Sequence, residues 1–307
     1  GTTSAPYSSG QNSVAVGYQA LKSFTTIGGI TAVGYQSLTA LTTGVGNSGF
    51  ADRTLKLLTT GTYNTALGNQ AMENTVDGDR NTAVGYQAGS YFKNNYSTAV
   101  GFNAGKTASG SHNTFVGNEA GLGGGGTSAP HSSGQYNTAV GSEALKDFTT
   151  AESVVAIGYL AGENITTGTG NTLVGKSSGD AITSAEYNTA VGVGSLGAMT
   201  TGGNNNTALG AFAASSINDT DAIENVAIGA YAGTGGAGAL KRTVAIGFGA
   251  LNSTGTADVI GAVAIGYNAL TAANNTNIDY SVGIGHSSLQ ALQSGQHNVE
   301  LRAFIPI

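Results

Sequence analysis

A five-residue phrase, Asn-Thr-Ala-Val-Gly, returns along the whole 307-residue chain and constrains its fold more than any other feature. It stands complete at 81–85 and 137–141, and aligning its variants on the final residue gives seventeen copies. Successive copies are 16 to 19 residues apart, except for a step of 24 residues between Gly117 and Gly141. This period is too short for repeats of paired helices and suits one turn of a β-solenoid. We therefore predict an all-β, parallel β-solenoid of about 17 coils, with one coil per copy.

The sequence also contains a longer duplication, in addition to this short period. Residues 3–26 match residues 127–150 at an offset of 124, with 17 of 24 positions identical. The join contains the run GLGGGG at 121–126, whose composition is typical of a loop rather than of a domain break. The sequence predicts a first block of coils at 1–120, a Gly-rich insertion at 121–136, and a second block at 137–307 that ends in a cap strand.

The residue before the final glycine of the phrase is large and apolar in every copy. Side chains two residues apart in a strand point to the same side, and Thr or Val stands two residues earlier in all copies but one. We predict that both rows face the inside of the coil. The predicted core row consists of Val16, Val33, Leu67, Val84, Val100, Val116, Val140, Ile157, Val174, Val191, Leu209, Ile228, Ile246, Ile265 and Ile284.

The alternation then places the small residues of the phrase on the outer side, together with its opening Asn. Gly and Ala are unfavourable in strands, and Gly in a strand often marks the close approach of another backbone. We predict a subunit interface there, made of Ala15, Ala66, Ala83, Ala139, Ala190, Gly85, Gly141 and Gly192. The alternative is that Gly only turns the chain and that the Ala row is a shallow exposed surface.

After the glycine come one or two variable residues, a small third residue, and then often a Leu, which we expect inside the coil. Asn opens the phrase in ten copies and is expected to form a hydrogen-bonded ladder between coils. The competing hypothesis is a sugar-binding surface of Asn and Tyr, with Tyr86 and Tyr159 as its candidate ligand residues.

Composition excludes several classes of protein. Hydrophobic residues make up 40% of the chain and recur in register, which argues against intrinsic disorder. A net charge of -6, with only 11 Lys and Arg, leaves no positively charged surface for nucleic acid. No apolar run is long enough for a membrane span. Cysteine is absent, which excludes disulfides and thiolate metal sites.

No catalytic, cofactor or metal site is predicted, and we do not expect an enzyme. The four histidines, His112, His131, His286 and His297, have no metal-ligand spacing and are expected on the surface. The acidic pairs Asp77 with Asp79 and Asp219 with Asp221 lack the full calcium-loop pattern, so we expect them to be solvated turn residues.

The phrases NTAVGYQAG at 81–89, NTALGNQAM at 64–72 and SVAVGYQAL at 13–21 resemble repeats of phage tail fibres and related bacterial surface proteins. The VAIG stretches ending at Gly158, Gly229, Gly247 and Gly266 are similar to the repeats of trimeric autotransporter adhesin heads. The resemblance covers nearly the whole chain. It implies a left-handed parallel β-roll assembled as a homotrimeric rod, extracellular or carried on a virion, that contacts a host surface glycan or receptor.

We therefore expect a structural and adhesive fibre protein of a phage or virion. A bacterial surface adhesin, or a filament subunit whose copies stack end to end, is the first alternative. Glu300 and Arg302 break the motif in the last strand and would blunt an open end, whereas the duplicated opening segment favours stacking. A monomeric ice- or surface-binding solenoid with a flat Thr array is the second alternative, although the orientation predicted above places Thr inside.

Overall fold

The structure is a computed structural model that describes residues 9–124, 132–218, 220–236, 238–255, 258–271, 278–292 and 295–302. These residues form short strands and turns, and they contain no helix. The chain divides into two compact units, 1–152 (unit 1) and 153–307 (unit 2). Each unit is a parallel β-solenoid, and the two together have about 16 turns. The predicted all-β solenoid is confirmed.

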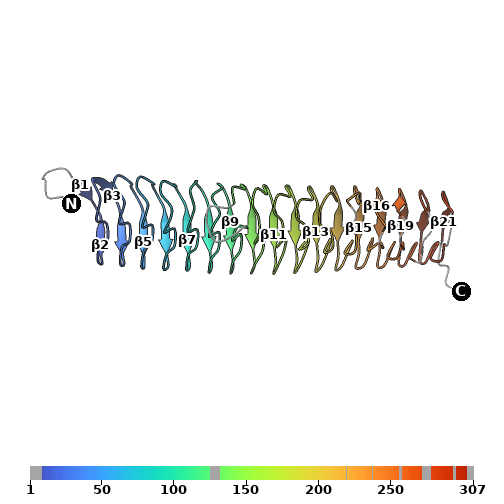
Figure 1. Cartoon of the computed structure of the whole chain (residues 1–307). Helices are drawn as coiled ribbons and strands as arrows, with labels where there is room; N and C mark the ends of the chain where they lie inside the picture. Colours follow the sequence, from blue (N-terminus) through green and yellow to red (C-terminus); the bar gives the residue numbers. More distant parts are fainter. Residues whose placement is uncertain are drawn as a thin grey trace. The chain divides into compact units, whose positions relative to one another are not determined.

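Unit 1 is a ladder of three-residue strands, each paired in parallel with the next strand of its ladder (Figure 1). The register joins equivalent residues of the repeat, so that Ala83 pairs with Ala66. The main ladder consists of β2 (Val14–Val16), β4 (Thr31–Val33), β5 (Ser48–Phe50), β6 (Thr65–Leu67), β7 (Thr82–Val84), β8 (Thr98–Val100), β9 (Thr114–Val116) and β10 (Thr138–Val140). A second short sheet joins β1 (Ser9–Gln11) to β3 (Thr26–Gly28).

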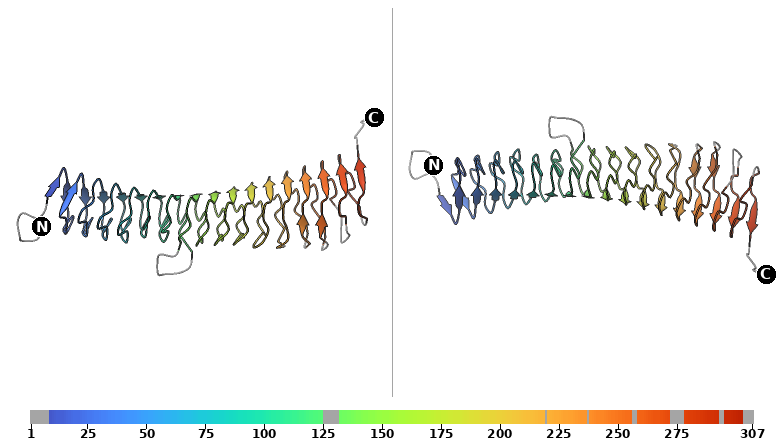
Figure 2. Two further views of the ribbon diagram at one scale, coloured as in Figure 1. Left: turned by 90° about the horizontal axis from the view of Figure 1, so that it is seen from above. Right: turned by 90° about the horizontal axis from the view of Figure 1, so that it is seen from below.

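Unit 2 repeats this design, and in both views of Figure 2 its main strands follow one edge of the stack. Its main ladder consists of β11 (Val155–Ile157), β12 (Thr172–Val174), β13 (Thr189–Val191), β14 (Thr207–Leu209), β15 (Val226–Ile228), β17 (Val244–Ile246), β19 (Val263–Ile265), β20 (Val282–Ile284) and β21 (Val299–Leu301). A second short sheet joins β16 (Leu240–Lys241) to β18 (Val259–Ile260).

The long step of 24 residues does not interrupt the ladder of unit 1. Strand β10 pairs with β9 in register, with Ala139 opposite Phe115. Gly124 N also donates to Phe148 O at 2.8 Å, which ties the start of the insertion to the following coil. Of the predicted insertion 121–136, residues 125–131 lie outside the described residues. The insertion therefore falls within unit 1, between two paired coils.

The strands face the opposite way from the prediction. The middle residue of each phrase points into the coil, and Ala66, Ala83, Ala139 and Ala190 are fully buried. Ala15 is exposed because it belongs to the first coil of the ladder. None of the fifteen residues of the predicted core row is buried: Val16 is 56% exposed and Leu67 is 50% exposed. The Thr or Val two residues earlier is likewise half-buried or exposed.

The reason for this orientation is the narrow interior of the coil. At Gly49, which occupies the Ala position of β5, an added Cβ would lie 2.7 Å from Ser37 Oγ and 3.4 Å from Leu38 Cδ1. The strand therefore lies directly against the small residue and the Leu that follow the glycine of the phrase. These Leu positions are inside as predicted, and Leu38 and Leu55 are fully buried. They supply the bulk of the core, and mostly small residues fit opposite them.

Two departures from the pattern show the same complementarity of size. Where Phe115 replaces the inward Ala, glycine replaces Leu in the facing turns, and an added Cβ would lie 2.7 Å from the Phe115 ring at Gly105. Leu173 similarly faces Gly162 and Gly179, where an added Cβ would lie 2.8 Å from it at each. Large and small residues have exchanged sides across one packed interior.

The glycine of the phrase is required by its own chain rather than by a sister molecule. Gly85 has φ 131°, and an added Cβ would contact the carbonyl oxygen of Gly101 in the next coil. A side chain there would strain the backbone and collide with the ladder. The predicted interface is therefore wrong for Ala66, Ala83, Ala139 and Ala190, whose side chains fill the coil. Gly85, Gly141 and Gly192 form a half-buried row that lets coils stack, and an interface at these glycines or at Ala15 stays a prediction.

The predicted Asn ladder is confirmed, but it lies inside the coil. Asn64 N donates to Asn47 Oδ1 at 2.9 Å, and Asn64 Nδ2 donates to Gly78 O at 2.7 Å. In unit 2, Asn206 N donates to Asn188 Oδ1 at 2.9 Å. Each buried amide thus satisfies backbone groups of neighbouring coils, as buried polar groups must be satisfied. Because these Asn side chains are buried, they cannot form part of a sugar-binding surface.

Candidate interaction surface

The outward residues of the main strands form a two-row surface on each unit, which we call the strand face. Its first row is mostly Thr in unit 1, whereas in unit 2 it is Val in β11, Thr in β12 to β14 and Val in the later strands. Its second row is Val, Leu or Ile except for Phe50 in β5. In unit 1 the first row includes Thr65, Thr82, Thr98, Thr114 and Thr138, and the second includes Leu67, Val84, Val100, Val116 and Val140. In-register pairing repeats each row at about 4.8 Å.

Exposed aromatic side chains border the strand face on both sides. On one side are residues that follow the glycine, such as Tyr86 and Phe102, whose ring centroids are 5.4 Å apart. On the other side are residues that precede the Asn, such as Tyr96 and His112, with centroids 5.0 Å apart. The stacking follows from the repeat, because equivalent residues of successive coils lie one above the other.

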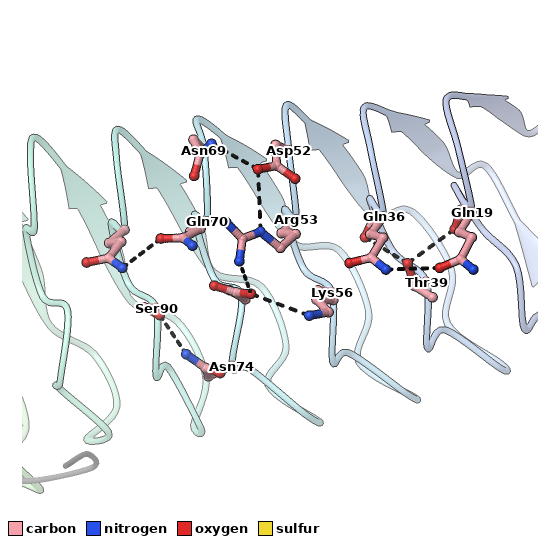
Figure 3. A network of polar contacts seen from close by, with 12 residues as sticks. Gln19, Gln36, Thr39, Asp52, Arg53, Lys56, Asn69, Gln70, Asn74 and Ser90 are labelled. Atoms are coloured by element: carbon pink, nitrogen blue, oxygen red, sulfur yellow. Dashed lines mark hydrogen bonds and ion pairs between the residues drawn. The ribbon is translucent and has the colours of Figure 1, made fainter.

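The turns that follow the strands carry polar side chains, and these already bond to one another (Figure 3). In unit 1, Arg53 lies 3.4 Å from Asp52 and 3.6 Å from Glu73, and Lys56 lies 3.7 Å from Glu73. Gln36 Nε2 donates to Gln19 Oε1 at 3.0 Å across one coil step. Such exposed pairs contribute little energy each. The surface most in need of a partner is therefore the apolar strand face.

The candidate ligand residues Tyr86 and Tyr159 are both exposed. Tyr86 stacks on Phe102, so one face of its ring is covered. Tyr86 belongs to unit 1 and Tyr159 to unit 2. Their role in ligand binding stays a prediction.

The histidines and the residues of the acidic pairs that the structure describes lie outside the strands. His112, His286 and His297 are exposed, and His131 lies outside the described residues. Asp79 Oδ1 accepts from Thr62 N at 2.7 Å, which occupies that oxygen within the chain.

Asp219 also lies outside the described residues, and its predicted partner Asp221 bonds instead to Lys241. Lys241 Nζ lies 3.1 Å from both Asp221 and Asp258, which joins three coils. Hydrogen bonds to the two carboxylates raise the pKa of Lys241. Within the described ranges, no three His, Asp or Glu side chains gather where they could hold a metal ion.

The last strand of unit 2 presents a charged side chain at the inward position. Glu300 pairs with Gly283 in register and therefore occupies the position that is Ala in most coils. Its Oε2 accepts from Leu289 N at 2.5 Å. Any coil stacked onto this end would bury that carboxylate, at a high cost unless a cation pairs with it.

Sequence reasoning missed the strand face because it treated large apolar side chains as the core by default. The sequence did contain a signal for the correct orientation. Phe115 and Leu173 enlarge the middle residue in the copies where glycine replaces Leu in nearby turns. Compensating changes of this kind mark two positions that share one interior.

No protein-family model, curated protein or solved structure matches this chain significantly. Among the residues that the structure describes, no helix could cross a membrane.

Proposed function

We propose that this chain is one subunit of a homotrimeric fibre, extracellular or carried on a virion, with a structural and adhesive role and no enzymatic activity. The strand face is the observation that supports this proposal. Continuous exposed apolar surface of this kind marks interaction sites in soluble proteins. A phage or virion fibre that attaches to a host glycan or receptor is the assembly that the repeat resembles.

A second copy of the chain is the partner that best fits the strand face. A copy related by rotation about the ladder axis would present the same rows with the same spacing of about 4.8 Å. Each coil would then meet its own equivalent, as symmetric interfaces require. The packing of half-exposed Val, Leu and Ile side chains against one another would stabilise the assembly.

Native mass spectrometry, with sedimentation equilibrium over a range of concentrations, tests the proposal. Three chains per particle are expected. A single chain at every concentration would contradict the fibre, and two chains would contradict the trimer.

A cellular adhesin or extracellular filament subunit is the first alternative, and Glu300 argues against its stacked form. A head-to-tail filament would bury the Glu300 carboxylate at each junction. Electron micrographs showing filaments that lengthen with concentration would favour this alternative.

An ice- or surface-binding solenoid is a second candidate function, favoured by the outward Thr row of unit 1. The predicted inward orientation of Thr counted against it, and that orientation is wrong. Five successive coils present Thr beside Val or Leu on a strand face. The same face cannot bind ice and be covered by sister chains, so thermal hysteresis activity with a native mass of one chain would replace the fibre proposal.

A further inference from the structure

Unit 1 carries a column of five planar side chains beside its Thr row, which we call the Tyr–Arg column. Its members directly precede the Asn or Ser that opens the phrase in successive coils, and all five are exposed. Every member has a positive φ, between 56° and 63°. This backbone conformation is repeated from coil to coil and aligns the side chains. The column consists of Tyr63, Arg80, Tyr96, His112 and Tyr136.

The guanidinium of Arg80 lies between the rings of two tyrosines. Its guanidinium carbon lies 5.8 Å from the ring centroid of Tyr63 and 5.4 Å from that of Tyr96. Arg80 Nη1 also donates to Tyr96 Oη at 3.1 Å. Cation–π contact on both faces with one hydrogen bond restricts the side chain before any ligand arrives. The remaining N–H donors of Arg80 lie in the plane of the guanidinium, and the edge that does not face Tyr96 Oη is its free edge.

Arg80 differs from the other arginines of the described chain in having neither a carboxylate nor a backbone carbonyl as a partner. Arg53 pairs with Asp52 and Glu73, and Arg242 lies 3.0 Å from Glu224. Asp79, its neighbour in sequence, accepts instead from Thr62 N and Oγ1. Within the described ranges, no carboxylate lies within ion-pair distance of Arg80. A fixed, exposed guanidinium without an anion is a site for an anion from outside the chain.

The rest of the column determines what kind of anion fits. Tyr63 and Tyr136 are exposed, and their hydroxyls can donate hydrogen bonds. His112 stacks between Tyr96 and Tyr136, with centroid distances of 5.0 Å and 5.1 Å. The column therefore presents a line of donors spaced at one coil step, with one positive charge in it. A linear polymer rich in hydroxyl and ether oxygens, with carboxylates along it, matches that line.

We propose that the Tyr–Arg column binds a linear polysaccharide with carboxylate groups, and that Arg80 pairs with one carboxylate through its free edge. Nucleic acid fits less well, because single strands bind through bases that stack on aromatic rings, and the rings of Tyr96 and His112 are already covered on both faces within the column. This inference rests on the proposed adhesive role and names its ligand class. It does not depend on the number of chains in the fibre.

The test is the binding of polygalacturonate to the full chain, measured by calorimetry at an ionic strength of about 0.05 M. Arg80→Gln is expected to weaken binding at least tenfold, because the loss of a hydrogen-bonded charge pair costs about 1.5 to 3 kcal/mol. Arg80→Lys keeps the charge but loses the planar fork, and a loss of about threefold or more is expected. Lys22→Gln removes an exposed positive charge far along unit 1 and is expected to change nothing.

Three results would overturn the inference. One is unchanged binding in Arg80→Gln, and another is an equal loss in Lys22→Gln, which would indicate general charge attraction. The third is a lack of selectivity for the carboxylate polysaccharide, seen as equal binding of methyl-esterified polygalacturonate or of single-stranded DNA with the same dependence on Arg80. Far-ultraviolet circular dichroism and native mass of each variant show that the fold is retained, and Arg80→Lys serves if Arg80→Gln misfolds. A native mass of one chain would count against the fibre but not against this site.

Discussion

Units 1 and 2 have the same interior but differ in their strand faces. Buried Ala occupies the middle of most strands in both, as at Ala83 and Ala245. The outer rows differ: unit 1 repeats Thr before Val, whereas the later coils of unit 2 repeat Val before Ile. These later coils contain Val226, Ile228, Val244, Ile246, Val263, Ile265, Val282 and Ile284. The four coils from β15 to β20 thus lack hydroxyl groups on the strand face.

This difference shows that the interior and the face obey separate constraints. The interior is limited by the narrow coil, and buried Ala fits the middle of most strands in both units. The residue types of the strand face are not limited by the interior and can differ according to the partner that contacts the face. An aromatic column borders the Val/Ile coils of unit 2, and within it Phe248 and Tyr267 stack with centroids 5.5 Å apart. We infer that unit 2 contributes most of the association energy of the proposed fibre.

The largest expected effect tests whether the two interiors are equivalent. Ala83→Leu and Ala245→Leu each add bulk to a filled coil and should each lower the free energy of unfolding by about 3 kcal/mol. The outward control Val84→Ala should lower it by about 1 kcal/mol or less. Urea unfolding at a concentration where all variants have the same native mass measures these values. A larger loss of unfolding free energy in Val84→Ala than in Ala83→Leu would contradict this orientation and would support the predicted one, in which Val84 faces inward.

The next effect concerns where the copies associate. Ile246→Lys places a charge in the Val/Ile coils and should weaken association at least about 100-fold, because an unpaired buried charge is costly. Val84→Lys in unit 1 should weaken it only about tenfold, since the neighbouring Thr hydroxyls leave that face more polar. Sedimentation equilibrium measures both. Equal effects would show that the two faces contribute alike.

A smaller effect on association is expected when the Thr and Val residues of the first rows are exchanged between the two strand faces. A triple change of Val226, Val244 and Val263 to Thr gives unit 2 the pattern of unit 1, and association should weaken about tenfold. The reciprocal change of Thr82, Thr98 and Thr114 to Val should strengthen it by a similar factor, because Val and Thr differ by a hydroxyl that must be desolvated. Loss of thermal hysteresis in the second variant, if the wild type had any, would instead favour the ice-binding candidate.

The smallest effect is a pH dependence confined to unit 2. The backbone N–H of Ala239 and the Lys241 ammonium lower the pKa of Asp258. A lowered pKa stabilises the folded chain above the unfolded value of about 3.9 and loses that contribution as pH falls through the folded value. Because the carboxylate is half exposed, only a few tenths of a kcal/mol are expected. Asp258→Asn should remove that part of the dependence between pH 5 and 2 in thermal unfolding, and an unchanged profile would contradict the assignment.

The repeat predicted the ladder, its register and the role of the buried Leu, because one period maps onto one coil. The side of the strand was predicted wrongly, because strand alternation alone does not say which side is inside. Resolving it requires the opposing residues, and these lie in the turns, as Ser37 and Leu38 do opposite Gly49. The Tyr–Arg column was missed because its members differ in type and share only their position before the phrase.

The glycine of the phrase lies against the carbonyl oxygen of the equivalent residue in the next coil. This contact also limits how such a chain can change its length. Because each coil lies on the next through the same contact as at Gly85 and Gly101, adding or removing a complete repeat leaves every remaining junction intact. A change of one residue within a strand would move the later side chains of that strand to the wrong side. Growth by copying whole segments, as in the duplication at an offset of 124, is therefore the route that the architecture permits. Irregular lengths are accommodated only in the turns, where the insertion between β9 and β10 lies.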